Sequence, residues 1–182
     1  MRTSKIKAHE YSPTKNDTLI MDTNILIKIL YPVNYKNNFQ AYEKIYSKAI
    51  ESKSKMLISS IQISEFINTC IRLQFNLYRD GQDMDFKKDY RSTEDYRNNM
   101  KAILEIIEQD ILGNFTLIDD NFTSMKQKAL FIYGFSYDFN DAFLAELARI
   151  NSAQLITDDA DFANYSSEIN IVTANSKLLM FS

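Results

Sequence analysis

Short apolar segments alternate along the chain with longer segments in which apolar residues recur every three or four positions. Five of the short segments have the composition of buried strands: 18–21, 56–58, 115–118, 153–157 and 169–173. Continuous apolar runs are typical of parallel strands, which are covered on both faces. The longer periodic segments predict amphipathic helices, the clearest over 38–52 and 99–112. This alternation predicts an α/β fold with a mostly parallel sheet of about five strands flanked by helices.

Several helix ends are marked by residues that satisfy free backbone groups. Ser59 and Gln62 have the spacing of a capping box, which predicts a helix from there to about Leu77. Asp138 is expected to cap a later helix, and Gly113 is expected to end the helix that precedes it. Two further helices are expected, over 25–30 and over 122–133, the latter ended by Gly134.

The chain is organised as one domain with two irregular parts. Its 182 residues, 45% of them hydrophobic, suit a single core. Residues 1–17 are polar and without periodicity, so we interpret them as an N-terminal arm ahead of a domain over 18–182. Residues 79–99 are rich in charge and poor in aliphatic side chains. They are expected to form an insertion or the tip of a helical hairpin.

The charge balance restricts the kinds of partner. With 21 Lys and Arg against 24 Asp and Glu, the net charge is −3, which does not favour a broad basic surface for nucleic acid. Any nucleic acid is therefore expected to be held locally. One cysteine, Cys70, and one histidine, His9, exclude a disulfide and a zinc cluster. No apolar run is long enough to span a bilayer, so we expect a cytoplasmic protein with no membrane partner.

Acidic residues recur where predicted strands end. Asp22 follows the first strand, Glu65 lies on the helix after the second, and Asp159 and Asp161 follow the fourth. Asp141 is in the first turn of the helix that leads to the fourth strand. Ligands of open α/β sheets bind at the carboxyl ends of the strands, so we expect these acids to meet there.

Four or five neighbouring carboxylates cannot all remain ionised without positive charge, because their repulsion raises their pKa values. Carboxylate and hydroxyl oxygens are ligands that Mg²⁺ and Mn²⁺ prefer. Such an ion activates water and neutralises charge at a phosphate, so the chemistry needs no histidine base. The pattern therefore predicts a Mg²⁺ or Mn²⁺ site.

Four segments resemble the signature segments of PIN domains and occur in the family's order. They are Leu19–Asn24, Ser64–Glu65, Asp141–Ala145 and Leu155–Phe162. The resemblance covers about residues 18–173 and implies a three-layer α/β fold and a metal-dependent endoribonuclease. PIN domains are often the VapC-like toxins of toxin–antitoxin pairs, and the chain resembles these toxins. It therefore implies an RNA substrate, an antitoxin protein as partner, and a homodimer.

The resemblance also assigns roles to individual residues. Asp22, Glu65 and Asp141 are implied to be catalytic metal ligands, with either Asp159 or Asp161 as the fourth acid. Three neighbouring polar residues are implied to orient these carboxylates through hydrogen bonds: Thr23, Asn24 and Thr157.

Each acid also has an ordinary structural interpretation. Asp22 alone suits a turn, Glu65 a solvated helix face, and Asp141 the first turn of a helix, where the helix dipole favours acids. The main alternative function is a non-catalytic PIN-fold module that binds RNA or protein. An aspartyl-phosphate phosphatase is disfavoured because Asn24 stands where that chemistry needs a second aspartate.

Overall fold

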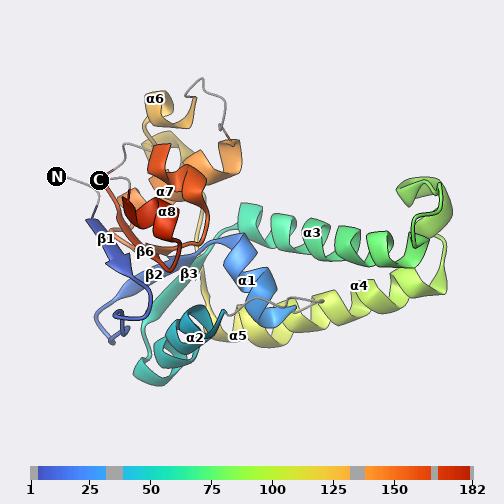
Figure 1. Cartoon of the computed structure of the whole chain (residues 1–182), viewed down its shortest axis with the longest axis horizontal. Helices are drawn as coiled ribbons and strands as arrows, with labels where there is room; N and C mark the ends of the chain where they lie inside the picture. The colour runs from blue at the N-terminus through green and yellow to red at the C-terminus, as the bar shows by residue number, and fades with distance from the viewer. Residues whose placement is uncertain (1–3, 32–38, 132–137, 165–167, 181–182) are drawn as a thin grey trace.

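The computed structural model describes residues 4–31, 39–131, 138–164 and 168–180 (Figure 1). In these residues six strands form one parallel sheet in the order β1-β6-β5-β2-β3-β4. The strands are β1 (Ser4–Lys7), β2 (Thr18–Met21), β3 (Lys55–Ile58), β4 (Thr116–Leu117), β5 (Gln154–Ile156) and β6 (Asn170–Thr173). The predicted α/β class and its parallel sheet are confirmed.

The inner strands are buried on both faces, which explains their continuous apolar sequences. Along β2, Leu19 and Met21 belong to one hydrophobic core, whereas Ile20 belongs to a second core on the other face. This follows from the two-residue period of strand side chains. The strand β2 lies between β3 and β5, so the residue that follows it lies near the middle of the sheet edge.

Helices cover both faces of the sheet (Figure 1). Three of them contribute to the first core: α1 (Thr23–Leu30), α2 (Gln40–Ser52) and α3 (Ser60–Arg79). Three others lie over the second: α6 (Gln127–Leu130), α7 (Phe139–Ile150) and α8 (Ser176–Met180). The sheet therefore forms the middle of three layers.

A long helical hairpin extends from the sheet (Figure 1). It consists of α3 and α4 (Glu94–Ile106), joined through a tip that holds the π-helical turn η1 (Phe86–Tyr90). After α4 the chain continues through η2 (Ile107–Ile111) and α5 (Leu112–Asn114) into β4. Residues 79–99 thus lie at the distal end of the hairpin, and aromatic side chains that include the buried Tyr90 and Phe86 pack there.

The strand β1 is not predicted by the sequence pattern. It lies in the segment interpreted as an arm, and it pairs in parallel with β6, Ser4 opposite Asn170. As an edge strand it is only partly buried, with the single apolar residue Ile6 packed against the first core, and backbone pairing with β6 places it in the sheet. Hydrophobic patterning therefore carries no signal for it.

The helix expected over 122–133 is broken. The structure has a 3₁₀ turn, η3 (Phe122–Ser124), followed by the short α6, while Tyr133 and Gly134 lie outside the described residues. The break has a physical cause, because the Lys126 amide donates to the buried Glu146 carboxylate at 2.8 Å instead of to a helical carbonyl.

Other helix ends differ from expectation in smaller ways. Gly113 lies inside α5 and does not terminate it. The Asn114 side chain instead donates to the Asp110 carbonyl at 2.8 Å, and the helix ends at the extended residue Phe115 without a left-handed glycine. The α4 helix starts earlier than predicted, because the Thr93 hydroxyl accepts from the Tyr96 amide.

Two predicted caps are confirmed. Ser59 and Gln62 form a reciprocal capping box at the start of α3, and the Asp138 side chain accepts from the Asn140 amide at the start of α7. Asn38, expected to start the helix now seen as α2, lies outside the described residues. No helix in the described part of the chain is long and apolar enough to cross a membrane.

Candidate metal centre

The parallel sheet brings its strand ends to one edge. Asp22 follows β2 directly, and Thr157 follows β5, the neighbouring strand. The ladder extends to Asp22, whose amide donates to the Ile156 carbonyl at 2.9 Å. Glu65 lies in the second turn of α3, which begins just after the other neighbour, β3. These positions follow from the topology alone.

Asp22 is almost completely buried, with 4% of its surface exposed. It caps α1 by accepting from the Asn24 amide at 3.0 Å through Oδ1, and its Oδ2 accepts from the Thr157 hydroxyl at 2.7 Å. Burial raises its pKa to about 6, and these two hydrogen bonds oppose that rise. Asp22 therefore caps α1 and is at the same time a buried acid whose ionised form is disfavoured by desolvation.

Glu65 points from α3 toward the same edge. Its Oε2 accepts from the Thr23 hydroxyl at 2.9 Å, which joins α3 to the first residue of α1. Burial raises the Glu65 pKa, and the charge of Asp138 raises it further. The contact shows that Glu65 is not on a purely solvated helix face.

Asp141 has the largest shift among the acids of the edge. Burial is the main cause that raises its pKa to about 8, and the remaining causes are the charges of neighbouring carboxylates. In decreasing order these neighbours are Asp22, Asp138, Asp159 and Glu65. The structure thus brings acids from four separate chain segments into mutual electrostatic range.

The loop after β5 places Asp159 and Asp161 differently. The Asp159 amide donates to the Thr157 hydroxyl at 3.0 Å, and Asp159 Oδ1 accepts from the Asp161 amide at 2.9 Å. The 3₁₀ turn η4 (Ala160–Asn164) begins here. Asp159 contributes to the raised pKa of Asp141, whereas Asp161 is not among the causes of that shift.

The three polar residues expected to orient the carboxylates contact them through different groups. Thr23 and Thr157 are buried, and their hydroxyls donate to Glu65 and Asp22 respectively. Asn24 reaches Asp22 through its backbone amide, while its side chain is exposed. Its contribution at this position therefore comes from the main chain.

A hydrogen-bond network beside the acids is not anticipated by the sequence. The buried Tyr42 hydroxyl of α2 donates to Asp158 Oδ1 at 2.7 Å and accepts from the Ala174 amide at 2.7 Å. Asn175 donates to the Asp158 carbonyl, and Lys28 Nζ lies 3.8 Å from Asp158 Oδ2. The network ties the loops after β5 and β6 to α1 and α2. Only the run of acids at 158–161 gives a sequence signal for it.

The donor chemistry of this edge fits a hard divalent cation. The side chains that could bind a cation offer carboxylate oxygens. The charges of the neighbouring carboxylates add to the effect of burial on the Asp141 pKa, and a bound cation would offset that repulsion. In the described residues no three acidic, histidine or cysteine side chains converge as a preformed cation site. Hydrogen bonds from Thr23 and Thr157 hold Glu65 and Asp22 in their present positions.

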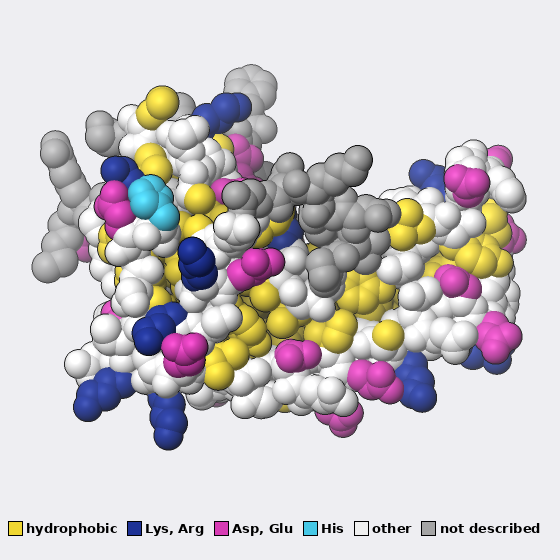
Figure 2. Space-filling view, turned by 60° about the horizontal axis from the view of Figure 1, so that its bottom comes forward, with side chains coloured by type: hydrophobic (Ala, Val, Ile, Leu, Met, Phe, Trp, Pro, Cys, Tyr) yellow, Lys and Arg dark blue, Asp and Glu magenta, His cyan; other side chains and the backbone are white. Residues whose placement is uncertain are grey.

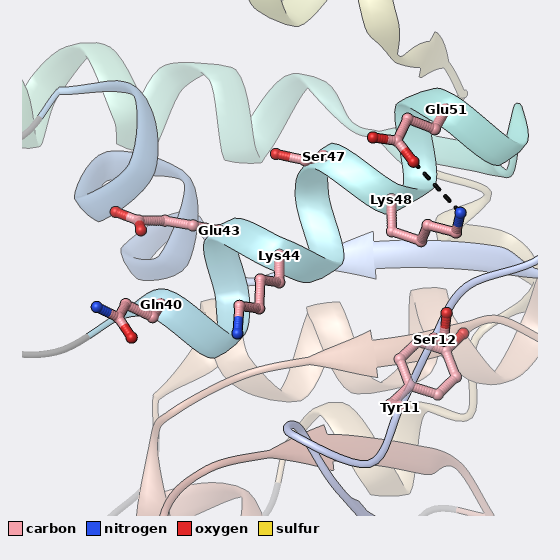
Figure 3. Close-up of a pocket in the computed structure, with 8 residues that line it drawn as sticks. All are labelled: Tyr11, Ser12, Gln40, Glu43, Lys44, Ser47, Lys48 and Glu51. Atoms are coloured by element: carbon pink, nitrogen blue, oxygen red, sulfur yellow. Dashed lines mark hydrogen bonds and ion pairs between the residues drawn. The ribbon is translucent and has the colours of Figure 1, made fainter.

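Two hollows on the surface could hold a ligand, and they differ in their distance from the acidic sheet edge. The larger, about 500 Å³, lies between Tyr11, Ser12 and the outer face of α2, and the sticks in Figure 3 show polar side chains that include the Lys48–Glu51 ion pair. It contains none of the acids at the sheet edge. A smaller hollow of about 310 Å³ borders Glu65 and is lined by Ile61, Ser64, Asn68, Thr69 and Asn140. The smaller one adjoins the candidate metal centre.

The fold and the acidic edge define an α/β protein with a parallel sheet and a candidate hard-cation site. A sequence model of the PIN domain matches residues 19–168. The chain belongs to the PIN domain family.

Comparison with solved structures gives several matches, among them two neighbours with low sequence identity. VapBC2 from Rickettsia felis, crystallised bound to a DNA fragment from its promoter, has 18% identity and a TM-score of 0.47, covering 86% of this chain and 98% of that chain. PAE2754 from Pyrobaculum aerophilum has 14% identity and a TM-score of 0.45, covering 92% and 90% respectively. A search of curated proteins gives no match.

Proposed function

We propose that the chain is a metal-dependent ribonuclease that hydrolyses RNA phosphodiester bonds at the acidic sheet edge. The observation that carries the proposal is geometric: the neighbouring strands β2, β3 and β5 bring acids from four chain segments to one sheet edge. The raised pKa of Asp141, caused first by burial and then by four neighbouring carboxylates, agrees with it. Membership of the PIN domain family supports the same activity.

In this proposal Asp22, Glu65 and Asp141 hold Mg²⁺ or Mn²⁺, and Asp159 orients the attacking water. Asp161 remains the alternative fourth acid. The Thr157 and Thr23 hydroxyls fix the Asp22 and Glu65 carboxylates in position through hydrogen bonds. When bound, the cation supplies positive charge that acidifies water and neutralises charge at the phosphate. The lone His9 is two-thirds exposed and takes no part.

A non-catalytic module that binds RNA or protein is the second candidate. The net charge of −3 favours it, and on the face drawn in Figure 2 Lys and Arg side chains are scattered among acids without a continuous basic surface. Such a module does not require a cation. An antitoxin partner, a homodimer and a cytoplasmic location remain predictions from the sequence.

The test is incubation of the purified protein with a mixed pool of structured RNAs in Mn²⁺, in Mg²⁺ and in EDTA. We expect cleavage in either metal, none in EDTA, and a loss of at least about a hundredfold in the Asp22→Asn variant. Asp83→Asn, which removes an exposed carboxylate at the hairpin tip, is the matched control and is expected to cleave normally. Intact RNA in every condition, with no Mn²⁺ bound in a titration, would favour the non-catalytic module.

A further inference from the structure

A polar stripe on α3 begins at the candidate metal centre and follows the hairpin outward. Glu65, Arg72 and Arg79 are spaced by seven residues, so they lie on one face of the helix at intervals of roughly 10 Å. Asn68 and Thr69 lie on the same face between the first two and line the hollow beside Glu65. The hollow therefore opens onto a helix face that leads to two arginines.

These arginines are held against buried aromatic rings. The Arg72 guanidinium carbon lies 3.8 Å from the centre of the Phe86 ring, and that of Arg91 lies 5.3 Å from the same ring. The Arg79 guanidinium lies 5.6 Å from the centre of Phe75. The two rings are buried and pack edge to face at 5.3 Å, so they form a fixed support. A guanidinium on an aromatic face keeps its in-plane N–H donors available.

The charges around the stripe leave these donors available. In the described part of the chain, no carboxylate lies within ion-pair distance of Arg72, Arg79 or Arg91. Two of the nearby acids are engaged by the main chain of η1. Asp85 accepts from the Lys87 and Lys88 amides, and Asp89 accepts from the Asp85 amide. Asp85 and Asp89 therefore complete the local fold of the tip.

We propose that Arg72, Arg79 and Arg91, here named the arginine stripe, bind the phosphodiester backbone of a single-stranded RNA segment. The scissile bond of that segment lies at the acidic edge, and the chain continues past Asn68 and Thr69 along α3. Planar guanidinium groups match phosphate oxygens in bidentate geometry. The inference rests on the proposed ribonuclease activity, and it explains how an acidic protein grips RNA locally. Its occupant is RNA, and an acidic protein segment is the competing outcome.

The test is fluorescence anisotropy with a labelled single-stranded RNA of about 20 nucleotides and mixed sequence, in EDTA so that binding is separate from cleavage. The test variant is Arg72→Gln/Arg79→Gln/Arg91→Gln. The matched control is Lys7→Gln/Lys48→Gln/Lys101→Gln, which also removes three positive charges, each paired with a glutamate. Circular dichroism establishes that both variants are folded. The single variant Arg79→Gln, at the exposed end of α3, serves if the triple variant does not fold.

We expect the stripe variant to bind about tenfold more weakly or worse. The slope of log K against log salt concentration is expected to become shallower by about 2, since each phosphate contact on a single strand contributes about 0.7 to that slope. Arg79→Gln alone is expected to make the same slope shallower by about 0.7. The control is expected to bind like the unmodified protein.

Equal losses in the stripe variant and the control, or no binding by the unmodified protein, would overturn the inference. Cleavage of the same RNA in Mn²⁺ by the unmodified protein tests the proposed function separately. Cleavage without a selective loss of binding in the stripe variant would support the ribonuclease activity and contradict RNA binding by the arginine stripe. A selective loss of binding without any cleavage would support RNA binding by the stripe and contradict the ribonuclease activity.

Discussion

Asp22 and Asp141 represent two ways of placing a carboxylate at the sheet edge. Asp22 is buried and receives two hydrogen bonds, which hold its pKa at about 6 against strong desolvation. Asp141 is also desolvated by burial, and the charges of four neighbouring carboxylates add to that effect, so its pKa rises to about 8. The first arrangement fixes the position of an acid, and the second creates a demand for positive charge.

The Asp141 shift has a consequence for stability. A carboxyl whose folded pKa is raised stabilises the fold fully below its unfolded pKa and loses that contribution as pH rises through the folded value. Asp141→Asn is therefore expected to melt higher than the unmodified protein in EDTA, by clearly more at pH 9 than at pH 5. Each kcal/mol by which the substitution increases the free energy of unfolding is expected to raise the Tm by about 2–4 °C. A melting difference that does not grow between pH 5 and 9 would show that the pKa of Asp141 is not raised in the folded protein.

Thr157 is expected to control cation affinity through Asp22. Its buried hydroxyl donates to Asp22 and accepts from the Asp159 amide, so Thr157→Val removes both bonds. We expect about 10–100-fold weaker Mn²⁺ binding by calorimetry for Thr157→Val. Thr157→Ser keeps the hydroxyl and is expected to bind within a few fold of the unmodified protein. Equal affinities of the two variants would contradict this role.

At the scale of elements, the order of strands places the site. Because β2 lies between β3 and β5, the ends of three strands meet beside Asp22, and α3 and the loop after β5 deliver Glu65 and Asp159. The helix α2 then supports that loop through Tyr42, far away in sequence. The acids depend on this support for their relative positions.

Tyr42→Phe is expected to weaken this support. It removes the hydroxyl that bonds Asp158 and leaves the Ala174 amide without its partner, a loss of about 1–3 kcal/mol. Thermal unfolding is expected to begin several degrees lower, and Mn²⁺ affinity is expected to fall. Tyr46→Phe on the same helix is the control, since its hydroxyl has one long contact of 3.5 Å with Asn114. Similar losses in both variants would indicate a general effect on α2.

The sequence predicts the inner strands and the acids at their ends because burial on both faces and the motif spacing leave a local signal. It misses β1, whose pairing with β6 depends on backbone hydrogen bonds across the whole chain. It also misses the break at Lys126, since Glu146 is distant in sequence and its bond there has no local pattern. The roles of Tyr42 and Asp158 are missed for the same reason.

At the scale of the molecule, a compact three-layer body carries the acids and a projecting hairpin carries the arginine stripe (Figure 1). The division suits an acidic protein. Repulsion between the acidic edge and RNA falls when a cation is bound, while the stripe supplies local positive charge at a distance. The overall charge of −3 therefore does not have to be reversed for RNA to bind.

Cation binding is expected to depend on pH in the range of the pKa values of Asp22 and Asp141. Protons leave Asp141 and Asp22, with pKa values of about 8 and about 6, when the cation binds. Asp22 is mostly ionised above pH 6, so between pH 6 and 8 the proton released by Asp141 is expected to raise the Mn²⁺ affinity by up to about tenfold per pH unit. Calorimetry in two buffers of different ionisation enthalpy counts these protons. A constant affinity and no proton release would show that the cation binds elsewhere.

The most direct test of the account is cleavage of one end-labelled RNA in ¹⁸O-water, with Mn²⁺ or EDTA, by the unmodified protein and by Asp22→Asn. Hydrolysis by water at the acidic edge predicts ¹⁸O in the phosphate of the product in Mn²⁺ alone, and no cleavage by the variant. Cleavage that persists in EDTA or in Asp22→Asn, or that leaves unlabelled 2′,3′-cyclic phosphate ends, would contradict the proposed metal-dependent ribonuclease.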